Sequence, residues 1–365
     1  MNKTVLICPL DWGIGHATRC VPVIRLFLDS GYKVFLAADG RPYDFLHKEF
    51  PNLEIIRFPG TKIRYANKRG LALKILFQLP RIFSGIKREH RFLNTLITNH
   101  PVDIIVSDNR YGVWHKKTLS ILITHQLEPR LPKGAGLFSS ILRNFMYRQF
   151  ARFSECWIPD FENHLGLAGK LSHTIKPVHN SFYIGHLSRF EGLSAPIELT
   201  GSPVNDILFM ISGPEPQRSV FEEIIYSQVK NSGIKAIIVR GIIERSEVFD
   251  LSETCKVYSH LGTNEMLHCI LQSEFIISRP GYSSIMDIVT LGKRAIFVPT
   301  PGQTEQEYLS KYLMDKKIYF SMEQRSFDLI YALEMSRNYP GMVIRNDYSV
   351  LRERIIRQEA IGNRT

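Results

Sequence analysis

Short apolar runs alternate with longer amphipathic stretches along most of the chain. The runs at 4–8, 33–38 and 103–106 are rich in aliphatic and β-branched residues, as buried strands of parallel sheets are. Between the first two, residues 17–29 have the 3.6-residue period of a helix that ends before Gly31. This repeated strand–helix order predicts an α/β fold with doubly wound parallel sheets.

The same alternation restarts in the second half, with a strand at 207–211, a helix at 217–229 and a strand at 235–239. Between the halves, residues 187–203 are rich in Ser, Gly and Pro, which is typical of a linker. We therefore expect three parts: a Rossmann-like domain at 1–190, a second Rossmann-like domain at 203–345, and a C-terminal helix at 346–365.

The stretch 278–306 carries the most informative chemistry in the sequence. A strand before it stops at Arg279-Pro280-Gly281, a helix capped by Ser283 or Ser284 follows, and a second strand stops at Pro299. A glycine turn that leads into a helix N-terminus is a site for anions such as phosphate. Asp287, one turn into that helix, has a carboxylate that suits a sugar diol, so a nucleotide-sugar site is the first hypothesis.

Polar residues also follow three strands of the first half. Gly13, Gly15 and His16 follow the first strand, Asp108 ends the strand near 103–106, and His125 follows the strand at 119–123. Carboxyl ends of parallel strands share one edge of a sheet, so these groups are candidates for a single site. The rival interpretation of the first loop is a dinucleotide fingerprint, but Thr18 replaces its third glycine and Asp39 would have to bind the ribose.

Composition limits the compartment and the class of protein. The 365 residues contain five cysteines, scattered and nowhere spaced as CxxC, which argues against a disulfide framework or a zinc site. There is neither a signal-peptide pattern nor an apolar run long enough to span a bilayer. We expect a cytoplasmic protein.

The net charge of +11 is concentrated in the first half. Residues 61–100 contain nine Lys and Arg against one Glu, residues 130–152 contain five and no acid, and the remainder is slightly acidic. Both basic stretches also carry many long apolar side chains. They favour an anionic membrane surface as a partner, unless the apolar faces simply pack on the domain's own sheet. No nucleic-acid motif accompanies the charge.

The segment SRPGYSSIMDIVTLGKRAIFVPTPGQTEQEY, residues 278–308, closely resembles the donor-site signature of glycosyltransferases with the GT-B fold, in particular family 28. The N-terminal GIGHATR, residues 13–19, is similar to the glycine-rich loop and histidine of that class. The resemblance implies two Rossmann-like domains facing a cleft, with a C-terminal helix that returns to the first. It also implies the transfer of a hexose from a nucleotide diphosphate sugar, with UDP as the expected nucleotide.

Carried over by resemblance, Asp287 binds the donor ribose, and Gly281, Ser283 and Ser284 hold the diphosphate. Gln306 reads the hexose with Glu305 beside it, and the backbone around Leu261 contacts the uracil. Some positions depart from the family pattern: residues 212–216, with Ser212 and Gly213 as donor candidates, replace a glycine-rich turn, and Arg294 stands where proline is common.

The sequence has no DxD triplet for a metal, so a metal-independent, inverting transfer is expected, with no cofactor beyond the donor itself. Helix N-termini and the side chains of Arg218, Arg240 or Arg279 would neutralise the leaving diphosphate, although Arg279 is equally suited to a structural ion pair. His16 is the candidate base and Asp108 the alternative. Asp108, Arg110 and His125 are candidates for binding the acceptor, which we expect to be a lipid-linked or cell-envelope glycan.

Two other functions remain open. A nucleotide-sugar epimerase or hydrolase on the same fold would need no acceptor. A non-catalytic nucleotide-sugar binding subunit would need no base.

Overall fold

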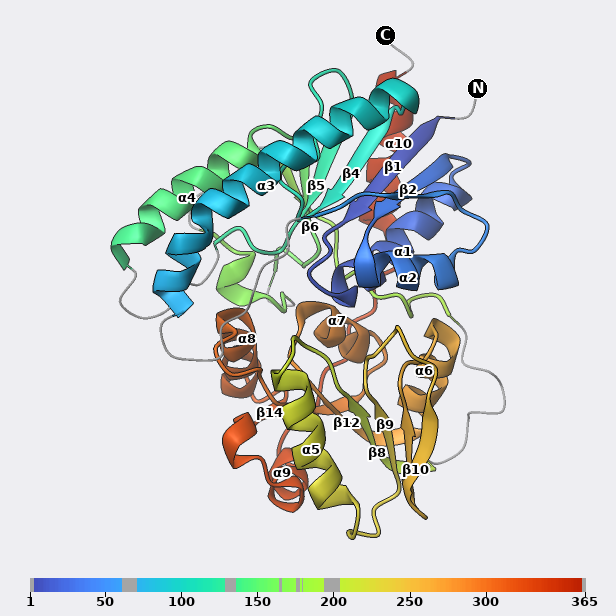
Figure 1. Cartoon of the computed structure of the whole chain (residues 1–365), viewed down its shortest axis with the longest axis vertical. Coiled ribbons are helices and arrows are strands. Elements are labelled where there is room, and N and C mark those ends of the chain that lie inside the picture. The colour runs from blue at the N-terminus through green and yellow to red at the C-terminus, as the bar shows by residue number, and fades with distance from the viewer. Residues whose placement is uncertain are drawn as a thin grey trace. The chain divides into compact units, whose positions relative to one another are not determined.

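The computed structural model describes residues 3–362 apart from 61–70, 129–135, 164–165, 175–177, 179 and 194–203. The chain divides into two compact units (Figure 1). Unit 1 comprises Met1–Arg189 together with Asn346–Thr365, and unit 2 comprises Phe190–Arg345. Most of the expected linker lies outside the described residues.

Unit 1 is built on a seven-stranded sheet in the order β3-β2-β1-β4-β5-β6-β7, with every neighbouring pair parallel. The strands are β1 (Thr4–Pro9), β2 (Lys33–Ala38), β3 (Ile55–Arg57), β4 (Ile104–Asp108), β5 (Leu119–Ile123), β6 (Glu155–Ile158) and β7 (Ser181–Tyr183). The helices are α1 (Ile14–Asp29), α2 (Gly40–Glu49), α3 (Leu71–Asn99), α4 (Gly136–Phe150) and the short 3-10 helix η1 (Gly169–Leu171). The central strands β1 and β4 are almost wholly buried, which explains why they are continuous apolar runs in the sequence.

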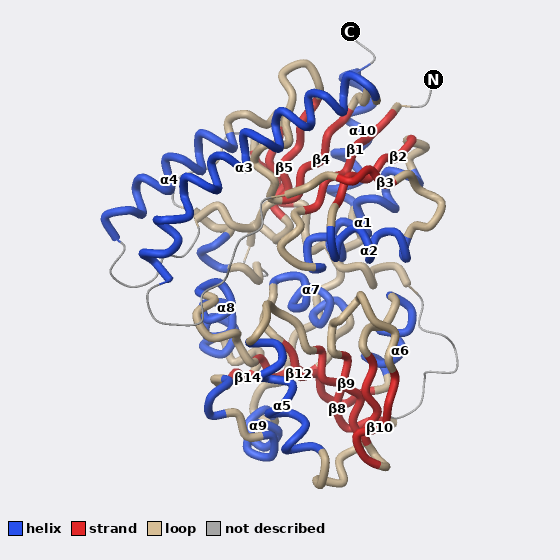
Figure 2. The backbone as a smooth tube through the Cα atoms, in the orientation of Figure 1, coloured by secondary structure: helices blue, strands red, loops and turns tan. Residues whose placement is uncertain are grey.

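Unit 2 repeats the plan with a sheet in the order β10-β11-β9-β8-β12-β13-β14. The strands are β8 (Asn205–Met210), β9 (Ala236–Val239), β10 (Val248–Ser252), β11 (Cys255–Tyr258), β12 (Ser273–Ser278), β13 (Arg294–Phe297) and β14 (Phe320–Ser321). The helices are α5 (Gln217–Val229), α6 (Thr263–Leu271), α7 (Tyr282–Thr290), α8 (Thr304–Asp315), η3 (Gln324–Ser326) and α9 (Leu329–Ser336). Figure 2 separates these strands from the helices that cover them.

The prediction of two Rossmann-like sheets is confirmed, with one correction to their parallel character. The edge strand β10 pairs antiparallel with β11 through a tight turn at 253–254. The sequence analysis missed it because its residues are mostly exposed, so the strand has no buried face to give an apolar pattern.

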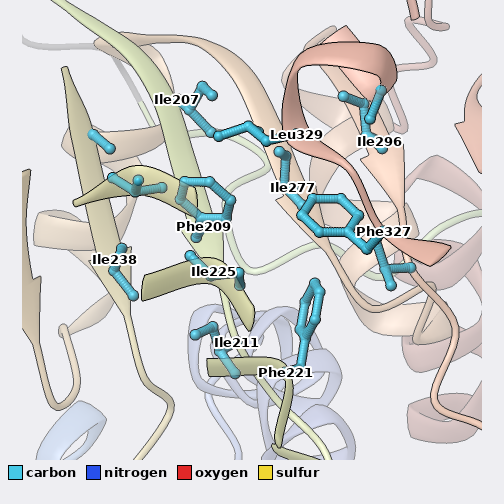
Figure 3. Close-up of a cluster of buried hydrophobic side chains, with 14 of the residues drawn as sticks. Ile207, Phe209, Ile211, Phe221, Ile225, Ile238, Ile277, Ile296, Phe327 and Leu329 are labelled. Atoms are coloured by element: carbon cyan, nitrogen blue, oxygen red, sulfur yellow. The ribbon is translucent and has the colours of Figure 1, made fainter. Parts of the chain in front are cut away.

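An apolar core lies between the unit 2 sheet and the helices α5 and α9. Phe209, Phe221, Ile277 and Phe327 belong to one buried cluster (Figure 3), and the rings of Phe221 and Phe327 meet edge to face at 5.5 Å. Such burial stabilises by about 2 kcal/mol for each large side chain. The cluster therefore fixes α5 and the strands whose carboxyl ends carry the candidate donor residues.

Both sheets reverse their winding between two neighbouring strands. In unit 1 the chain passes from β1 outward through β2 and β3 and returns at β4, and in unit 2 β8 and β12 stand in the same relation. The loops that follow these two strands diverge to opposite faces, so open α/β sheets bind ligands there. The predicted residues at 13–16, 108, 213 and 281 follow these four strands.

The helix α10 (Ser349–Gly362) belongs to unit 1, in agreement with the expected return of the C-terminus. Glu155 of β6 is its main anchor: the carboxylate forms an ion pair with Arg354 and accepts from Gln358 Nε2 at 2.9 Å. The Asn346 amide donates to the carbonyl of His186 at 2.8 Å. A side chain on Gly185 (φ 73°) would collide with Asn346, so this crossing requires glycine.

The basic helices α3 and α4 lie side by side (Figure 1), with Phe83 and Phe145 in edge-to-face contact at 4.7 Å. Part of their apolar face packs on the unit 1 sheet, since Leu93 and Met146 are buried. Phe92 remains 38% exposed, and Arg88 and Arg91 are exposed beside it. Among the described residues, no helix is long and apolar enough to cross a membrane.

The buried His186 next to this crossing predicts a pH-dependent stability. Its two ring nitrogens have no hydrogen-bond partner, and burial lowers the pKa of the imidazole to about 4, although Asp160 at 4.0 Å opposes the shift. In the unfolded chain this histidine binds a proton below about pH 6.5, whereas in the folded protein it does so only near pH 4. The free energy of unfolding is therefore highest above pH 6.5 and falls as the pH drops towards 4. The free energy of unfolding should fall by about 3 kcal/mol across this pH range.

His186→Leu should therefore flatten the dependence of the urea unfolding free energy on pH between 6.5 and 4. The exposed His47 of α2 provides a control, and His47→Leu should follow the wild-type curve. Parallel curves for wild type and His186→Leu would contradict the prediction.

Candidate functional site

In unit 1 a histidine and a carboxylate meet at the carboxyl edge of the sheet. Helix α1 begins at Ile14, three residues earlier than predicted, so His16 lies in its first turn. Its Nδ1 is 2.9 Å from Oδ1 of Asp108, the last residue of β4. Asp108 is fully buried, whereas the His16 side chain is 19% exposed. The edge thus presents an imidazole to solvent with a carboxylate behind it.

Arg19 holds this pair together, and the sequence analysis did not assign it a role. Its Nε donates to Asp108 Oδ2 at 2.6 Å, and its Nη2 pairs with Oδ1. Its Nη1 also lies 3.1 Å from Nδ1 of His125, so the three predicted residues His16, Asp108 and His125 are brought together around one guanidinium. The signal was the spacing within GIGHATR, since residues 16 and 19 share a helix face.

The electrostatics keep Asp108 ionised. Burial acts to raise the pKa of the Asp108 carboxyl, but Arg19 and His16 outweigh it and hold the pKa well below its usual range. Nδ1 of His16 lies 2.9 Å from Asp108 Oδ1 and 3.0 Å from Arg19 Nη2, so its role depends on the tautomer. In the tautomer that donates from Nδ1 to the carboxylate, the lone pair of Nε2 is available. The neighbouring Cys20 stays a neutral thiol, because burial and then Asp108 raise its pKa.

Arg110, predicted to bind the acceptor, makes its contacts within the protein. The Arg110 side chain is buried, pairs with Glu89 at 3.1 Å, and donates to the carbonyl of Phe58 while stacking over its ring. These contacts join the loop after β4 to α3 and to the loop after β3, and the acceptor role of Arg110 stays a prediction.

In unit 2 the helix N-terminus predicted from the sequence is present. Helix α7 begins at Tyr282, with Gly281 as N-cap and no acid in its first turn. The other helices at this edge have acidic partners: Glu265 accepts from the N-cap of α6, Glu215 accepts from Ser219 of α5, and α8 carries acids in its first turn. Helix α7 has no acid in its own first turn, so the positive end of its dipole favours an anionic ligand.

Residues around this terminus have the positions expected of a donor site. Ser283 and Ser284 lie in the first turn of α7, and Asp287 lies one turn on, with its side chain largely buried. Gln306 in the first turn of α8 accepts from the N–H of Thr300 at 2.8 Å, with Glu305 beside it.

Two further predicted positions follow other strands of the same sheet. Gly213 lies in the loop after β8, with φ of 112°, which only glycine adopts readily. Leu261 is buried just before α6, next to its N-cap Gly262.

The arginines predicted to neutralise the diphosphate are engaged elsewhere. Arg218 pairs with Glu215 at 2.6 Å and with Glu222, and Arg240 pairs with Glu222 at 2.6 Å and with Glu247 at 3.2 Å. These pairs join α5 to β9 and to the turn before β10. In the structure the two arginines hold these elements together, and their contact with the donor diphosphate stays a prediction.

Arg279 is likewise structural, as one of its two predicted interpretations had it. Its guanidinium donates to the carbonyls of Val298 and Pro299 at 2.9 and 3.2 Å and to that of Gln217 at 3.1 Å. It also stacks over Phe221 at 4.2 Å. Burial lowers the pKa of Arg279 to about 9; its two Nη atoms donate to these carbonyls, whereas its buried Nε has no hydrogen-bond partner among the described residues. The residue ties the starts of three loops together behind the candidate site.

No group of three or more His, Cys, Asp or Glu side chains able to hold a metal occurs within the described parts of the chain.

The chain is similar to known glycosyltransferases in sequence and in fold. Residues 244–336 match the profile of the Glycosyltransferase family 28 C-terminal domain. An uncharacterized glycosyltransferase of Methanosarcina mazei is 22% identical over 325 residues, covering 84% of this chain and 82% of that protein. The UDP-N-acetylglucosamine--N-acetylmuramyl-(pentapeptide) pyrophosphoryl-undecaprenol N-acetylglucosamine transferase of Buchnera aphidicola subsp. Baizongia pistaciae is 22% identical, covering 82% and 79%. The chain has the GT-B fold and resembles glycosyltransferases of family 28.

The fold match extends over both units. The crystal structure of the glycotransferase of kitacinnamycin superposes with a TM-score of 0.61 at 12% identity, covering 98% of this chain and 99% of that one. At this identity the likeness shows the fold alone. For the glycosyltransferase, the family implies a nucleotide sugar as ligand.

Replacement of Asp108 should destabilise the glycosyltransferase strongly. Asp108→Asn removes the carboxylate charge from the buried Arg19, and breaking a buried ion pair costs about 3–5 kcal/mol. Urea unfolding at pH 7.5 measures the change. The exposed pair of Asp39 and Arg57, at 3.4 Å, is a control, because Asp39→Asn should cost less than about 1 kcal/mol. Equal effects of the two replacements would contradict the burial argument.

Proposed function

We propose that the protein transfers a hexose from a nucleoside diphosphate sugar, most simply a UDP-sugar, to a hydroxyl group of an acceptor, with inversion and without a metal. The contact between His16 and Asp108 at the carboxyl edge of unit 1 carries the proposal. A UDP-sugar is favoured because the Buchnera relative is named for UDP-N-acetylglucosamine.

In the proposed reaction His16 Nε2 takes the proton of the acceptor hydroxyl while Asp108 stabilises the imidazolium that forms. The acceptor oxygen bonds to the anomeric carbon from the face opposite the diphosphate, and the bond to the diphosphate oxygen breaks with its electron pair. The diphosphate leaves as an anion. Attack from the opposite face inverts the anomeric centre.

The donor is assigned to unit 2. Gly281, Ser283 and Ser284 at the start of α7 would hold the diphosphate, because this helix N-terminus has no acid of its own. Asp287 would accept from the ribose hydroxyls, and Gln306 with Glu305 would contact the hexose. The backbone around Leu261 would contact the base, and Gly213 would let the donor approach the loop after β8.

The acceptor is proposed to be lipid-linked, reached from the membrane surface through α3 and α4. Arg88, Arg91 and the half-exposed Phe92 lie on one face of α3, and Arg143 and Arg148 of α4 are exposed. Basic residues with aromatic neighbours suit an anionic bilayer surface.

A thermal-shift screen across nucleotide sugars tests the donor assignment. A ligand that binds only the folded protein raises the melting temperature, so UDP-N-acetylglucosamine at a hundred times its Kd should stabilise by about 2.7 kcal/mol. A panel of uridine, guanosine, thymidine and cytidine sugars without a single shift would refute the central proposal. Release of free sugar with water as the only acceptor, at a rate no acceptor increases, would favour a hydrolase instead.

His16→Ala should lower kcat by about 10²- to 10⁴-fold, because the reaction loses its base. The affinity for the nucleotide sugar should stay near that of wild type, as measured by calorimetry. His115, which precedes β5 on the amino side of the sheet, gives the control His115→Ala with unchanged kcat. Full activity of His16→Ala would favour Asp108 or a water as base. A wild type that binds the nucleotide sugar but shows no turnover would favour a binding subunit.

Cosedimentation with vesicles of phosphatidylglycerol and phosphatidylcholine at low salt tests the membrane surface. The wild type should bind, and the double replacement of Arg88 and Arg91 by Glu should weaken binding at least tenfold, since each basic residue contributes about 1 kcal/mol. Reversal of the exposed Lys311 of α8 is the control and should change little. Binding that persists in 0.5 M NaCl, or that never occurs, would contradict an electrostatic membrane contact.

A further inference from the structure

Among the residues that the structure describes, Thr300 of unit 2 carries a buried hydroxyl without a hydrogen-bond partner. Thr300 is only 1% exposed, and its Oγ1 makes no hydrogen bond. A buried hydroxyl that lacks a partner costs stability, and native proteins rarely keep one without a reason. The position of Thr300 supplies that reason.

Thr300 lies where the sheet reverses its winding. The N–H of Val298 donates to the carbonyl of Ser278 at 3.0 Å, so the loops after β12 and β13 leave the sheet together, with Thr300 two residues further on. A Cβ atom on Gly213 would lie 3.4 Å from Thr300 Oγ1, which means that the hydroxyl faces the loop after β8. Because residue 213 is glycine, it places no Cβ atom against the hydroxyl.

The groups around Thr300 are directed at a ligand of defined chemistry. Its own N–H is bonded to Gln306 Oε1 at 2.8 Å, which commits the carbonyl end of that amide and leaves the NH₂ end as a donor. The N-terminus of α7, free of acids in its first turn, follows the adjacent strand β12. A donor molecule held by its diphosphate at α7 would thus meet a hydroxyl and an amide donor close by.

The hydrogen-bonding capacity of the Thr300 hydroxyl indicates which part of a nucleotide sugar, the diphosphate or the sugar, it would contact. A phosphate oxygen only accepts hydrogen bonds, so it would leave the acceptor side of Thr300 Oγ1 unsatisfied. A sugar hydroxyl both donates and accepts, so it can donate to Thr300 Oγ1 and accept from the Gln306 amide. We propose that Thr300 hydrogen-bonds a hydroxyl of the transferred sugar and so helps to determine the specificity for the donor. This inference rests on the proposed function.

Thr300→Val tests it, because valine keeps the shape and removes the hydroxyl. The melting temperature of the unliganded protein should stay the same or rise, since an unsatisfied group is removed. The Kd for UDP-N-acetylglucosamine should increase about tenfold by calorimetry, while the Kd for UDP should not change. Thr300→Ser, which retains the hydroxyl, should keep an affinity close to that of wild type.

Thr290 provides a matched control. It is a second threonine of unit 2 whose buried Oγ1 has no partner, and it ends α7 at the opposite terminus from Gly281. Thr290→Val should stabilise the unliganded protein similarly and leave both affinities unchanged.

The outcomes separate this inference from the proposed function. Equal losses for UDP and UDP-N-acetylglucosamine would assign Thr300 to the diphosphate and overturn the sugar contact. Unchanged affinities in Thr300→Val would show that the hydroxyl only packs, with the proposed function intact. A wild type that binds neither ligand would overturn both.

Discussion

A buried guanidinium organises the carboxyl edge of each sheet. In unit 1, Arg19 joins α1 to the end of β4 and to the loop after β5 through Asp108 and His125. In unit 2, Arg279 joins the end of β12 to the loop after β13 and to the start of α5 through carbonyl oxygens. Loops that diverge at a winding reversal have few backbone partners, so a long planar cation with five donors is suited to hold them. The difference between the two partners is also informative. Arg19 pairs with the carboxylate of Asp108, which contacts the imidazole of His16. Arg279 donates to backbone carbonyl oxygens instead, so the positive end of the α7 dipole is the feature of that edge that favours an anion.

Most of the fold follows from local patterns. Residues 278–298 were predicted as strand, turn, helix and strand to within a few residues, because Pro280, Gly281 and Gly292 mark the boundaries and the strands are buried on both faces. The start of α1 was missed, since Gly13 and Gly15 lower helix propensity while tertiary contacts of His16 and Arg19 hold the first turn in place. The exposed edge strand β10 gave no periodic signal at all. Local sequence preferences therefore predict most helices and strands, but a strand is recognisable in the sequence only where one of its faces is buried.

The sequence predicts which strand ends come together at the candidate sites, but it does not predict which charged side chains pair with each other. His16, Asp108 and His125 converge because parallel strands end at one edge, which the strand order alone dictates. Arg110, Arg218 and Arg240 were assigned to ligands because a lone arginine in the sequence shows no partner, yet Glu89, Glu222 and Glu247 neutralise them in the fold. Ion pairs between residues far apart in the sequence cannot be predicted from the spacing of residues along the chain. Thr300 was overlooked for the converse reason, since only the structure reveals that a hydroxyl has been left without a bond.

The return of residues 346–365 to unit 1 makes unit 2 an insertion within a discontinuous domain. Translation delivers all of unit 2 before the segment that carries Asn346 and Arg354, so the partners of Glu155 in α10 are absent while the rest of the sheet is already synthesised. Unit 2 is continuous in sequence and has its own core, and it can complete its fold in that interval. Unit 1 is closed last, by the final helix of the chain. The order of synthesis therefore places unit 2, to which we assign the donor, ahead of unit 1, to which we assign the base.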